Sequence, residues 1–272
     1  MCRWLAYSGD PVFLDELLFK PEHSLIEQSR SSYSSTTPTN ADGYGVGWYG
    51  DRRTPGLYRS IRPAWNDRNL QDLSRQIRSR LFLAHVRAAT GTPVQQTNCH
   101  PFRYGKWLFV HNGSIRELRK VKRDLVREVS QELYPNIEGT TDSEIMFYLA
   151  LTFGLEEDPI GSVARMAHLV ERVGAEHEVK NPLTMTLGIS DGQRIYSIRY
   201  ASDGHPRTLF HSKDMRALKE LNPRVEGLSD DARAVVSEPF GDLSDYWVEI
   251  RPSSSVVIDR GGLEIRDFGP LC

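Results

Sequence analysis

Residues 1–10 read Met-Cys-Arg-Trp-Leu-Ala-Tyr-Ser-Gly-Asp, and this opening segment decides how the rest of the chain is interpreted. Polar and apolar residues alternate loosely from Cys2 to Tyr7, and Ser8-Gly9-Asp10 interrupts the pattern. Such an alternation followed by turn-forming residues predicts a short strand that ends in a turn. The apolar run is too short for a signal peptide. We therefore expect the folded chain to begin in a sheet at its second residue.

Cys2 is the most informative residue of this segment. A small side chain after the initiator methionine permits the removal of Met1, which leaves a thiol and a free α-amine on one residue. The two groups titrate within about one pH unit of each other, so the amine can take the thiol proton directly or through a water. A cysteine standing alone would be interpreted as a small apolar residue of a first strand. If Met1 is retained, the amine is an amide and this chemistry is lost.

The composition indicates an ordinary globular domain. The 272 residues include 39% hydrophobic residues, and 34 basic side chains stand against 36 acidic ones, for a formal net charge of -2. This balance argues against a nucleic-acid or membrane surface, and no stretch reaches transmembrane length. The 3 cysteines form no dense disulfide pattern. We expect one domain over residues 1–272 in a reducing compartment, the cytoplasm.

The pattern of apolar residues predicts strands, then helices, then strands again. Strands are expected at 42–49, 80–86, 107–110, 183–190 and 194–200, with shorter ones at 208–210, 234–237, 246–250 and 256–258. Amphipathic or buried helices are expected at 115–133, 141–151 and 160–173. The Ser/Thr-rich segment 29–39 is interpreted as a loop over a site. This order suggests two sheets with helices outside them.

Polar residues that could take part in catalysis or substrate binding follow two of these strands. Asn112-Gly113 follows the apolar run 107–110, and an amide side chain with a glycine N–H supplies the two donors that an oxyanion hole requires. An ordinary Asn-Gly turn is the alternative. Arg87 follows the strand 80–86, where a guanidinium can grip a carboxylate with two hydrogen bonds. A solvated arginine at a strand end is the alternative there.

Asp142 lies at the start of a predicted helix. Thr141-Asp142-Ser143-Glu144 has the Thr-x-x-Glu spacing of a capping box. A carboxylate at this position can bind an ammonium group, but by itself it is more simply explained as a residue that compensates the helix dipole.

These elements occur together in a recognisable order. Cys2, Arg87-Ala88-Ala89-Thr90, His111-Asn112-Gly113 and Thr141-Asp142-Ser143-Glu144 resemble the class II glutamine amidotransferases. The segment 40–49 and the opening Met-Cys-Arg-Trp-Leu are similar to a smaller, stand-alone branch, which includes the ergothioneine-pathway γ-glutamyl hydrolase and the glutathione-degrading amidotransferase-like subunit. The resemblance is dense over residues 1–150 and thinner afterwards.

The resemblance implies a fold and a set of roles. The fold would be α+β, a four-layer αββα sandwich of N-terminal-nucleophile hydrolase type with two mainly antiparallel sheets. Cys2 would be the nucleophile, and the Asn112 side chain with the Gly113 N–H would form the oxyanion hole. Arg87 would bind the substrate α-carboxylate, Asp142 its α-ammonium, and Thr90 would add backbone or hydroxyl contacts.

The sequence departs from the family branch that is fused to sugar-phosphate synthases. That branch carries Trp after the arginine and His after the threonine, whereas Ala88 and Gly91 stand at these positions. Because of this difference, the resemblance does not define the outer part of the pocket or the identity of the substrate.

Three other patterns carry less weight. Residues 45–50 match G-x-G-x-x-G, but no helix-forming sequence follows, so a dinucleotide site is not expected. Cys99, His85, His100 and His111 match no compact zinc spacing, and we predict neither a metal nor a cofactor. The basic residues of 116–127 are explained by a solvated helix face, with a docking surface for a partner as the alternative.

The predicted reaction is cleavage of the γ-amide of glutamine or of a γ-glutamyl compound through a thioester on Cys2. A free-standing hydrolase and a glutaminase subunit that supplies ammonia to a separate synthase are both consistent with the residues. A non-catalytic binding subunit is the alternative of another class. The expected partners are a small-molecule substrate and a synthase or hydrolase subunit.

Overall fold

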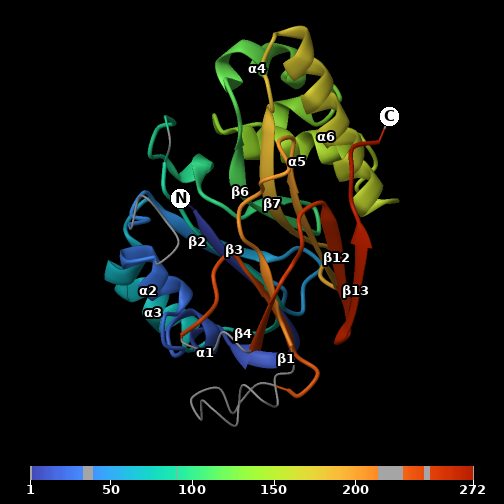
Figure 1. Ribbon diagram of the computed structural model, residues 1–272. Coiled ribbons are helices and arrows are strands. Elements are labelled where there is room, and N and C mark those ends of the chain that lie inside the picture. The colour runs from blue at the N-terminus through green and yellow to red at the C-terminus, as the bar shows by residue number, and fades with distance from the viewer. Residues whose placement is uncertain (1, 33–38, 90, 214–228, 242–245, 272) are drawn as a thin grey trace.

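The computed structural model describes residues 2–32, 39–89, 91–213, 229–241 and 246–271. Two antiparallel sheets pack face to face, and helices cover the outer face of each (Figure 1). Within the described ranges no helix is both long and apolar enough to cross a bilayer. The predicted four-layer αββα arrangement is confirmed.

The first sheet has seven strands in the order β11-β9-β10-β1-β4-β2-β3. Its strands are β1 (Arg3–Phe13), β2 (Tyr44–Trp48), β3 (Gly56–Ser60), β4 (Arg78–Val86), β9 (Phe210–Ser212), β10 (Arg233–Val236) and β11 (Trp247–Glu249). Three short helices pack on it, namely α1 (Asp15–Leu18), α2 (Leu25–Arg30) and α3 (Arg68–Ser74). The central strand β1 lies between β4 and β10, so the amino end of the chain is paired on both sides.

The second sheet has six strands in the order β13-β12-β8-β7-β6-β5. Its strands are β5 (Phe102–Tyr104), β6 (Trp107–Ile115), β7 (Leu183–Ser190), β8 (Arg194–Ala201), β12 (Ser254–Asp259) and β13 (Gly262–Asp267). The helices on its outer face are α4 (Leu118–Arg127), α5 (Asp142–Thr152) and α6 (Pro159–Glu176).

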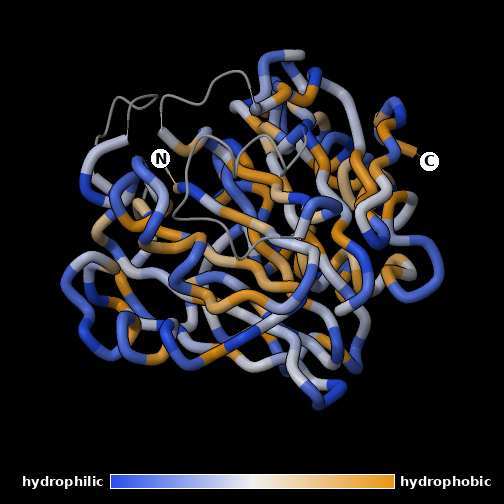
Figure 2. The backbone as a smooth tube through the Cα atoms, turned by 90° about the horizontal axis from the view of Figure 1, so that it is seen from below, coloured by the Kyte–Doolittle hydropathy of each residue, from blue (hydrophilic) through white to orange (hydrophobic). Residues whose placement is uncertain are grey.

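Hydrophobic stretches gather in the interior and hydrophilic ones on the outer turns (Figure 2).

Side-chain alternation along the strands creates three apolar layers. In β1, Trp4 and Ala6 point between the sheets, whereas Leu5 and Tyr7 point toward the helices of the first sheet. In β6, Leu108 and Val110 also join the layer between the sheets. The even-numbered residues at the amino end of β1 and those of β6 therefore face each other across the sandwich.

Two strands continue well past their predicted ends, and the strand predicted at 208–210 is found at Phe210–Ser212. β1 does not stop at the Ser8-Gly9-Asp10 turn but continues to Phe13, with a register irregularity between Ser8 and Val12. β6 does not end at Val110 but continues through His111-Asn112-Gly113 to Ile115, because these residues pair with β7. The predicted position of Asn112 after the end of a strand is wrong.

The helices follow the prediction more closely at α5 and α6 than at α4. Ile115 belongs to β6 and Leu133 lies beyond the helix, so α4 is shorter than the apolar spacing indicated. The segment 29–39 is also not wholly a loop, because Ser29 and Arg30 end α2, while residues 33–38 lie outside the described residues.

Candidate active site

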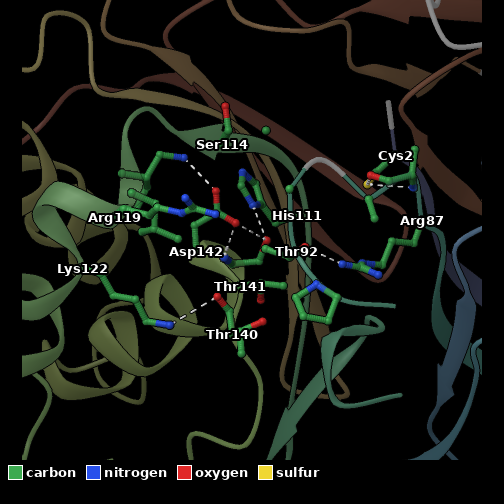
Figure 3. Close-up of a pocket in the computed structure, with 18 of the residues that line it drawn as sticks. Cys2, Arg87, Thr92, His111, Ser114, Arg119, Lys122, Thr140, Thr141 and Asp142 are labelled. Atoms are coloured by element: carbon green, nitrogen blue, oxygen red, sulfur yellow. Dashed lines mark hydrogen bonds between the residues drawn. The ribbon is translucent and has the colours of Figure 1, made fainter. Parts of the chain in front are cut away.

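A cavity of about 700 Å³ opens at one end of the sandwich. Four of the six predicted site residues line it: Cys2, Arg87, Gly113 and Asp142. They come from segments far apart in the sequence, and Figure 3 shows Cys2 and Arg87 on one side of the cavity and Asp142 on the other. Thr90 lies outside the described residues.

Cys2 is half-buried at the start of β1. Antiparallel pairing of β1 with β4 sets Arg3 opposite Val86, which brings Cys2 beside the residues that follow β4. The Cys2 Sγ lies 3.5 Å from the Ala88 N and 3.6 Å from the Ala88 O. The thiol is therefore in contact with backbone groups and open to the cavity.

A buried ion pair fixes the chain next to this thiol. Arg3 and Glu238 are both 3% exposed, and their closest charged atoms are 2.8 Å apart. Arg3 also donates to the Cys2 carbonyl at 3.0 Å, and His23 lies 2.5 Å from the other Glu238 oxygen. Because a buried pair is held by its own hydrogen bonds, it restricts the position of Cys2 more than a solvated pair could.

Arg87 is 3% exposed and held in a fixed orientation. Its Nη2 donates to Thr92 Oγ1 at 2.6 Å and its Nη1 donates to the Asp42 carbonyl at 3.3 Å. Asp42 in turn accepts from the Ala89 N at 2.7 Å, which ties down the segment that follows β4. A guanidinium has five N–H groups, so this arrangement leaves donors for an anion in the cavity.

Gly113 and Asn112 lie side by side within β6. A Cβ on Gly113 would approach the Thr184 carbonyl oxygen to 2.0 Å, so only glycine fits at this position. Asn112 is 2% exposed and is not among the described residues that line the cavity. By strand alternation the Asn112 side chain points between the two sheets, toward the even-numbered side chains at the amino end of β1. Its Oδ1 accepts from Arg207 Nη1 at 3.1 Å.

Asp142 is the first residue of α5, and its carboxylate also accepts a hydrogen bond from the last residue of β6. Its Oδ2 accepts from the Ile115 N at 2.8 Å and its Oδ1 from the Ser143 N at 2.8 Å. The predicted cap is present on one side, because Thr141 Oγ1 accepts from the Glu144 N at 3.2 Å. The Glu144 carboxylate instead accepts from the Glu138 and Gly139 backbones. Asp142 Oδ1 also accepts from Ser143 Oγ at 3.3 Å, whereas Oδ2 can still accept a second hydrogen bond.

Comparison with known proteins identifies the family. A family model described as class II glutamine amidotransferases matches residues 26–267. The chain belongs to the class II glutamine amidotransferases. The probable glutamine amidotransferase DUG3 of Saccharomyces cerevisiae is 33% identical over 96% of this chain and 82% of the yeast protein.

Two further relatives of this amidotransferase come from bacteria. A γ-glutamyl-hercynylcysteine sulfoxide hydrolase of Mycolicibacterium smegmatis is 34% identical over 57% of this chain and 65% of that protein. The solved structure of a glutamine aminotransferase class-II domain protein from Silicibacter pomeroyi matches with a TM-score of 0.77 at 32% identity, over 100% of both chains.

Several residues that line the cavity of the amidotransferase, or that hold its lining residues in place, were not predicted from the sequence. Thr92 and Asp42 hold Arg87, and no local pattern distinguishes either of them. Arg119 and Lys122 of α4 line the cavity, so the basic face of this helix is not only a solvated surface (Figure 3). Arg207 lies in the loop between β8 and β9, and only the fold brings it to Asn112.

Three buried histidines lie beside the cavity. The rings of His85 and His100 stack with centroids 4.1 Å apart, and the His111 Nδ1 lies 2.8 Å from Ser143 Oγ. Burial lowers the pKa of His85 to about 3 and also lowers the pKa of His100 and of His111. Among the described residues, no group of three or more His, Cys, Asp or Glu side chains could hold a metal ion. Because their pKa values are lowered, the three imidazole rings are uncharged at pH 7 and act as buried packing groups.

Acid is expected to destabilise the fold through these histidines. An unfolded histidine titrates near about 6.5, whereas the pKa of folded His85 is about 3, so between these two pH values the unfolded chain binds a proton at His85 that the folded chain does not. The lowered pKa values of His100 and His111 act in the same direction. The free energy of unfolding is therefore unaffected by His85 above about pH 6.5, and it falls by about 1.4 kcal/mol per pH unit from this residue as the pH drops toward its folded-state pKa. Urea unfolding of the wild type and of His85→Gln at several pH values measures this effect. The variant should show a shallower acid slope, and equal slopes would refute the assignment.

Proposed function

We propose that this class II amidotransferase hydrolyses the γ-amide of glutamine or of a γ-glutamyl compound through a γ-glutamyl thioester on Cys2. The observation that carries the proposal is the meeting of Cys2, Arg87, Gly113 and Asp142 around one cavity. The family match begins at residue 26, so the role of Cys2 is argued from this geometry and from its chemistry. We also propose that residues 1–272 form a single domain and that the protein acts in the cytoplasm.

The reaction needs removal of Met1, which frees the α-amine of Cys2. This amine takes the thiol proton, and the thiolate attacks the γ-carbonyl carbon of the substrate. The carbonyl oxygen becomes an oxyanion, for which the Gly113 N–H and the Asn112 Nδ2 are the proposed donors. Collapse of the intermediate breaks the C–N bond, and the leaving amine or ammonia departs with the proton. Water then cleaves the thioester and releases the γ-carboxylate.

The glutamyl head of the substrate is the part that the cavity is proposed to select. Arg87 binds its α-carboxylate and Asp142 its α-ammonium, and these two residues lie on opposite sides of the cavity (Figure 3). Thr90 is proposed to add a contact near Arg87. Selection of the head leaves the leaving group free to vary, which is consistent with relatives named for different substrates.

Replacement of Arg87 by lysine is expected to raise the KM for the γ-glutamyl substrate about 10- to 100-fold and to change kcat less. Lysine keeps the charge but loses the planar fork that matches a carboxylate. Steady-state kinetics measure the effect. Arg103→Lys on the exposed strand β5 is the matched control, because Arg103 bonds only to the Pro55 carbonyl among the described residues. An unchanged KM in Arg87→Lys would remove Arg87 from the substrate site.

A free-standing hydrolase is favoured over an ammonia-supplying subunit. The Mycolicibacterium smegmatis relative is named as a hydrolase of a γ-glutamyl compound, and this supports release of an amine rather than transfer of ammonia. Assays of glutamine and of γ-glutamyl dipeptides, with and without candidate partner proteins, separate the two activities. Strong glutaminase activity found only in a complex with a synthase would favour the subunit.

A non-catalytic binding subunit is tested with a glutamine-mimicking electrophile. If the electrophile labels the wild type and Cys2→Ala equally, Cys2 is not a nucleophile and the catalytic proposal is wrong. Labelling confined to the wild type supports the proposal.

A further inference from the structure

The side-chain amide of Asn112 has two possible orientations, and only one of them suits the proposed reaction. An oxyanion needs the Nδ2 group, which donates, whereas Oδ1 would repel the developing charge. In the described part of the chain, Asn112 has one side-chain hydrogen-bond partner, the Arg207 guanidinium at 3.1 Å. The orientation of the amide therefore depends on this contact.

A guanidinium can fix an amide orientation because it donates hydrogen bonds and accepts none. The atom of Asn112 that faces Arg207 must be Oδ1, and Nδ2 must then point away from Arg207. We propose that Arg207 is a positioning residue that holds the Asn112 amide with Nδ2 directed at the reaction centre. This inference rests on the proposed function, in which Asn112 supplies one donor to the oxyanion.

Arg207 is itself held in place by the structure. Its carbonyl accepts from Arg199 Nε at 2.7 Å, and Arg199 is 5% exposed. The next residue, Thr208, donates from Oγ1 to the Ser237 carbonyl at 2.9 Å, and Ser237 pairs with Trp4 in β1. The loop that carries Arg207 is thus tied to the strand that begins beside Cys2.

Arg207 interacts electrostatically with groups on both sides of the cavity. Burial lowers the pKa of Arg207, and the neighbouring Cys2 and Asp142 act in the opposite direction. Arg207 therefore lies close enough to influence the thiolate directly, and any test must separate that effect from the orientation of Asn112. The positive charge of Arg3, in β1, lowers the pKa of Arg207.

The backbone of Asn112 is fixed independently of Arg207. Trp4 Nε1 donates to Thr186 Oγ1 at 3.2 Å, and Thr186 Oγ1 donates to the Asn112 carbonyl at 3.2 Å. Asn112 also pairs with Thr186 in the β6–β7 register. Removal of the guanidinium should consequently free the amide to rotate without displacing the strand.

The kinetic test compares Arg207→Met, Asn112→Ala and the double variant. Loss of one oxyanion donor lowers kcat by about 10²- to 10³-fold, which is the expectation for Asn112→Ala. Arg207→Met should lower kcat about 10- to 100-fold with little change in KM, because a rotated amide still supplies Nδ2 part of the time. The double variant should be no slower than Asn112→Ala alone. Multiplied losses would overturn the inference.

Two further variants serve as controls, and the rate of Cys2 alkylation separates orientation from charge. Arg207→Lys keeps a positive donor and should recover most of the kcat lost in Arg207→Met. Arg194→Met makes the same chemical change at an exposed residue paired with Asp259, and it should leave kcat unchanged. Alkylation of Cys2 by iodoacetamide forms no oxyanion. If Arg207→Met slows alkylation as much as it slows turnover, Arg207 acts on the thiolate and the inference is wrong.

An activity-independent measurement distinguishes failure of this inference from failure of the proposed function. In protein labelled with ¹⁵N-asparagine, the side-chain NH₂ resonance of Asn112 can be assigned from its loss in Asn112→Ala. Arg207→Met should shift or split this resonance, and Arg194→Met should not. An unchanged resonance overturns the positioning role even if the wild type is active. A changed resonance supports it even if the wild type hydrolyses none of the assayed γ-glutamyl compounds.

Discussion

Replacement of Cys2 by alanine is expected to lower kcat by about 10⁴-fold or more, because it removes the protein atom that forms the covalent bond to the substrate in the proposed reaction. Binding should survive, since Arg87 and Asp142 remain in the cavity. Glutamate release from glutamine and from a γ-glutamyl dipeptide measures the rate. Intact-mass analysis of acid-quenched wild type should detect an added γ-glutamyl group that the variant lacks.

Cys99→Ala is the matched control for this change. Cys99 is fully buried, and its Sγ contacts the Ser60 and Gln95 carbonyls rather than the cavity. Burial also raises the pKa of the Cys99 thiol, which keeps it in its unreactive form. This variant should retain turnover, with any loss confined to stability. Turnover that persists in Cys2→Ala would refute the thioester mechanism.

Retention of an amino-terminal extension is expected to lower kcat by about 10²- to 10⁴-fold, the contribution of a positioned general base. The contacts of Cys2 explain why. Its Sγ hydrogen bonds are to the Ala88 backbone, and no described His, Asp or Glu side chain bonds to it. We therefore propose the α-amine of Cys2 as the base that takes the thiol proton. A lysine inserted between Met1 and Cys2 would block methionine removal and convert this amine into an amide.

A cleavable leader provides the control for this experiment. A leader that a protease removes immediately before Cys2 should give an inactive protein that gains full activity on cleavage. Circular dichroism and unfolding midpoints before and after cleavage show whether the fold itself has changed. Full activity before cleavage would show that another group takes the thiol proton.

The short motifs of the sequence indicated candidate site residues, and the structure brings four of them to one cavity. Cys2 and Arg87 come together because β1 and β4 pair in an antiparallel register that sets Arg3 opposite Val86. The order of strands and helices indicated the layers, and the family resemblance supplied the identity of the fold. Helix α5 was found from the Thr141 cap and the apolar run that follows it.

The remaining features depend on neighbours that are distant in the sequence. Gly113 was placed after the end of a strand, whereas it lies within β6 because this part of the chain pairs with β7. The nearby Thr184 carbonyl, which leaves no room for a Cβ, explains the glycine. Ile115 shares the apolar spacing of α4, yet it pairs with Leu183 in the sheet. Arg207 belongs to a loop with no motif, and its contact with Asn112 spans 95 residues.

The ion pair between Arg3 and Glu238 joins positions 235 residues apart. During translation Arg3 leaves the ribosome long before Glu238 is made. The same holds for β10, which pairs with β1 along Leu5 to Ser8. A nascent chain that has not reached β10 and Glu238 lacks the contacts that hold the segment beside Cys2, so we expect the proposed site to form only after these residues have been made.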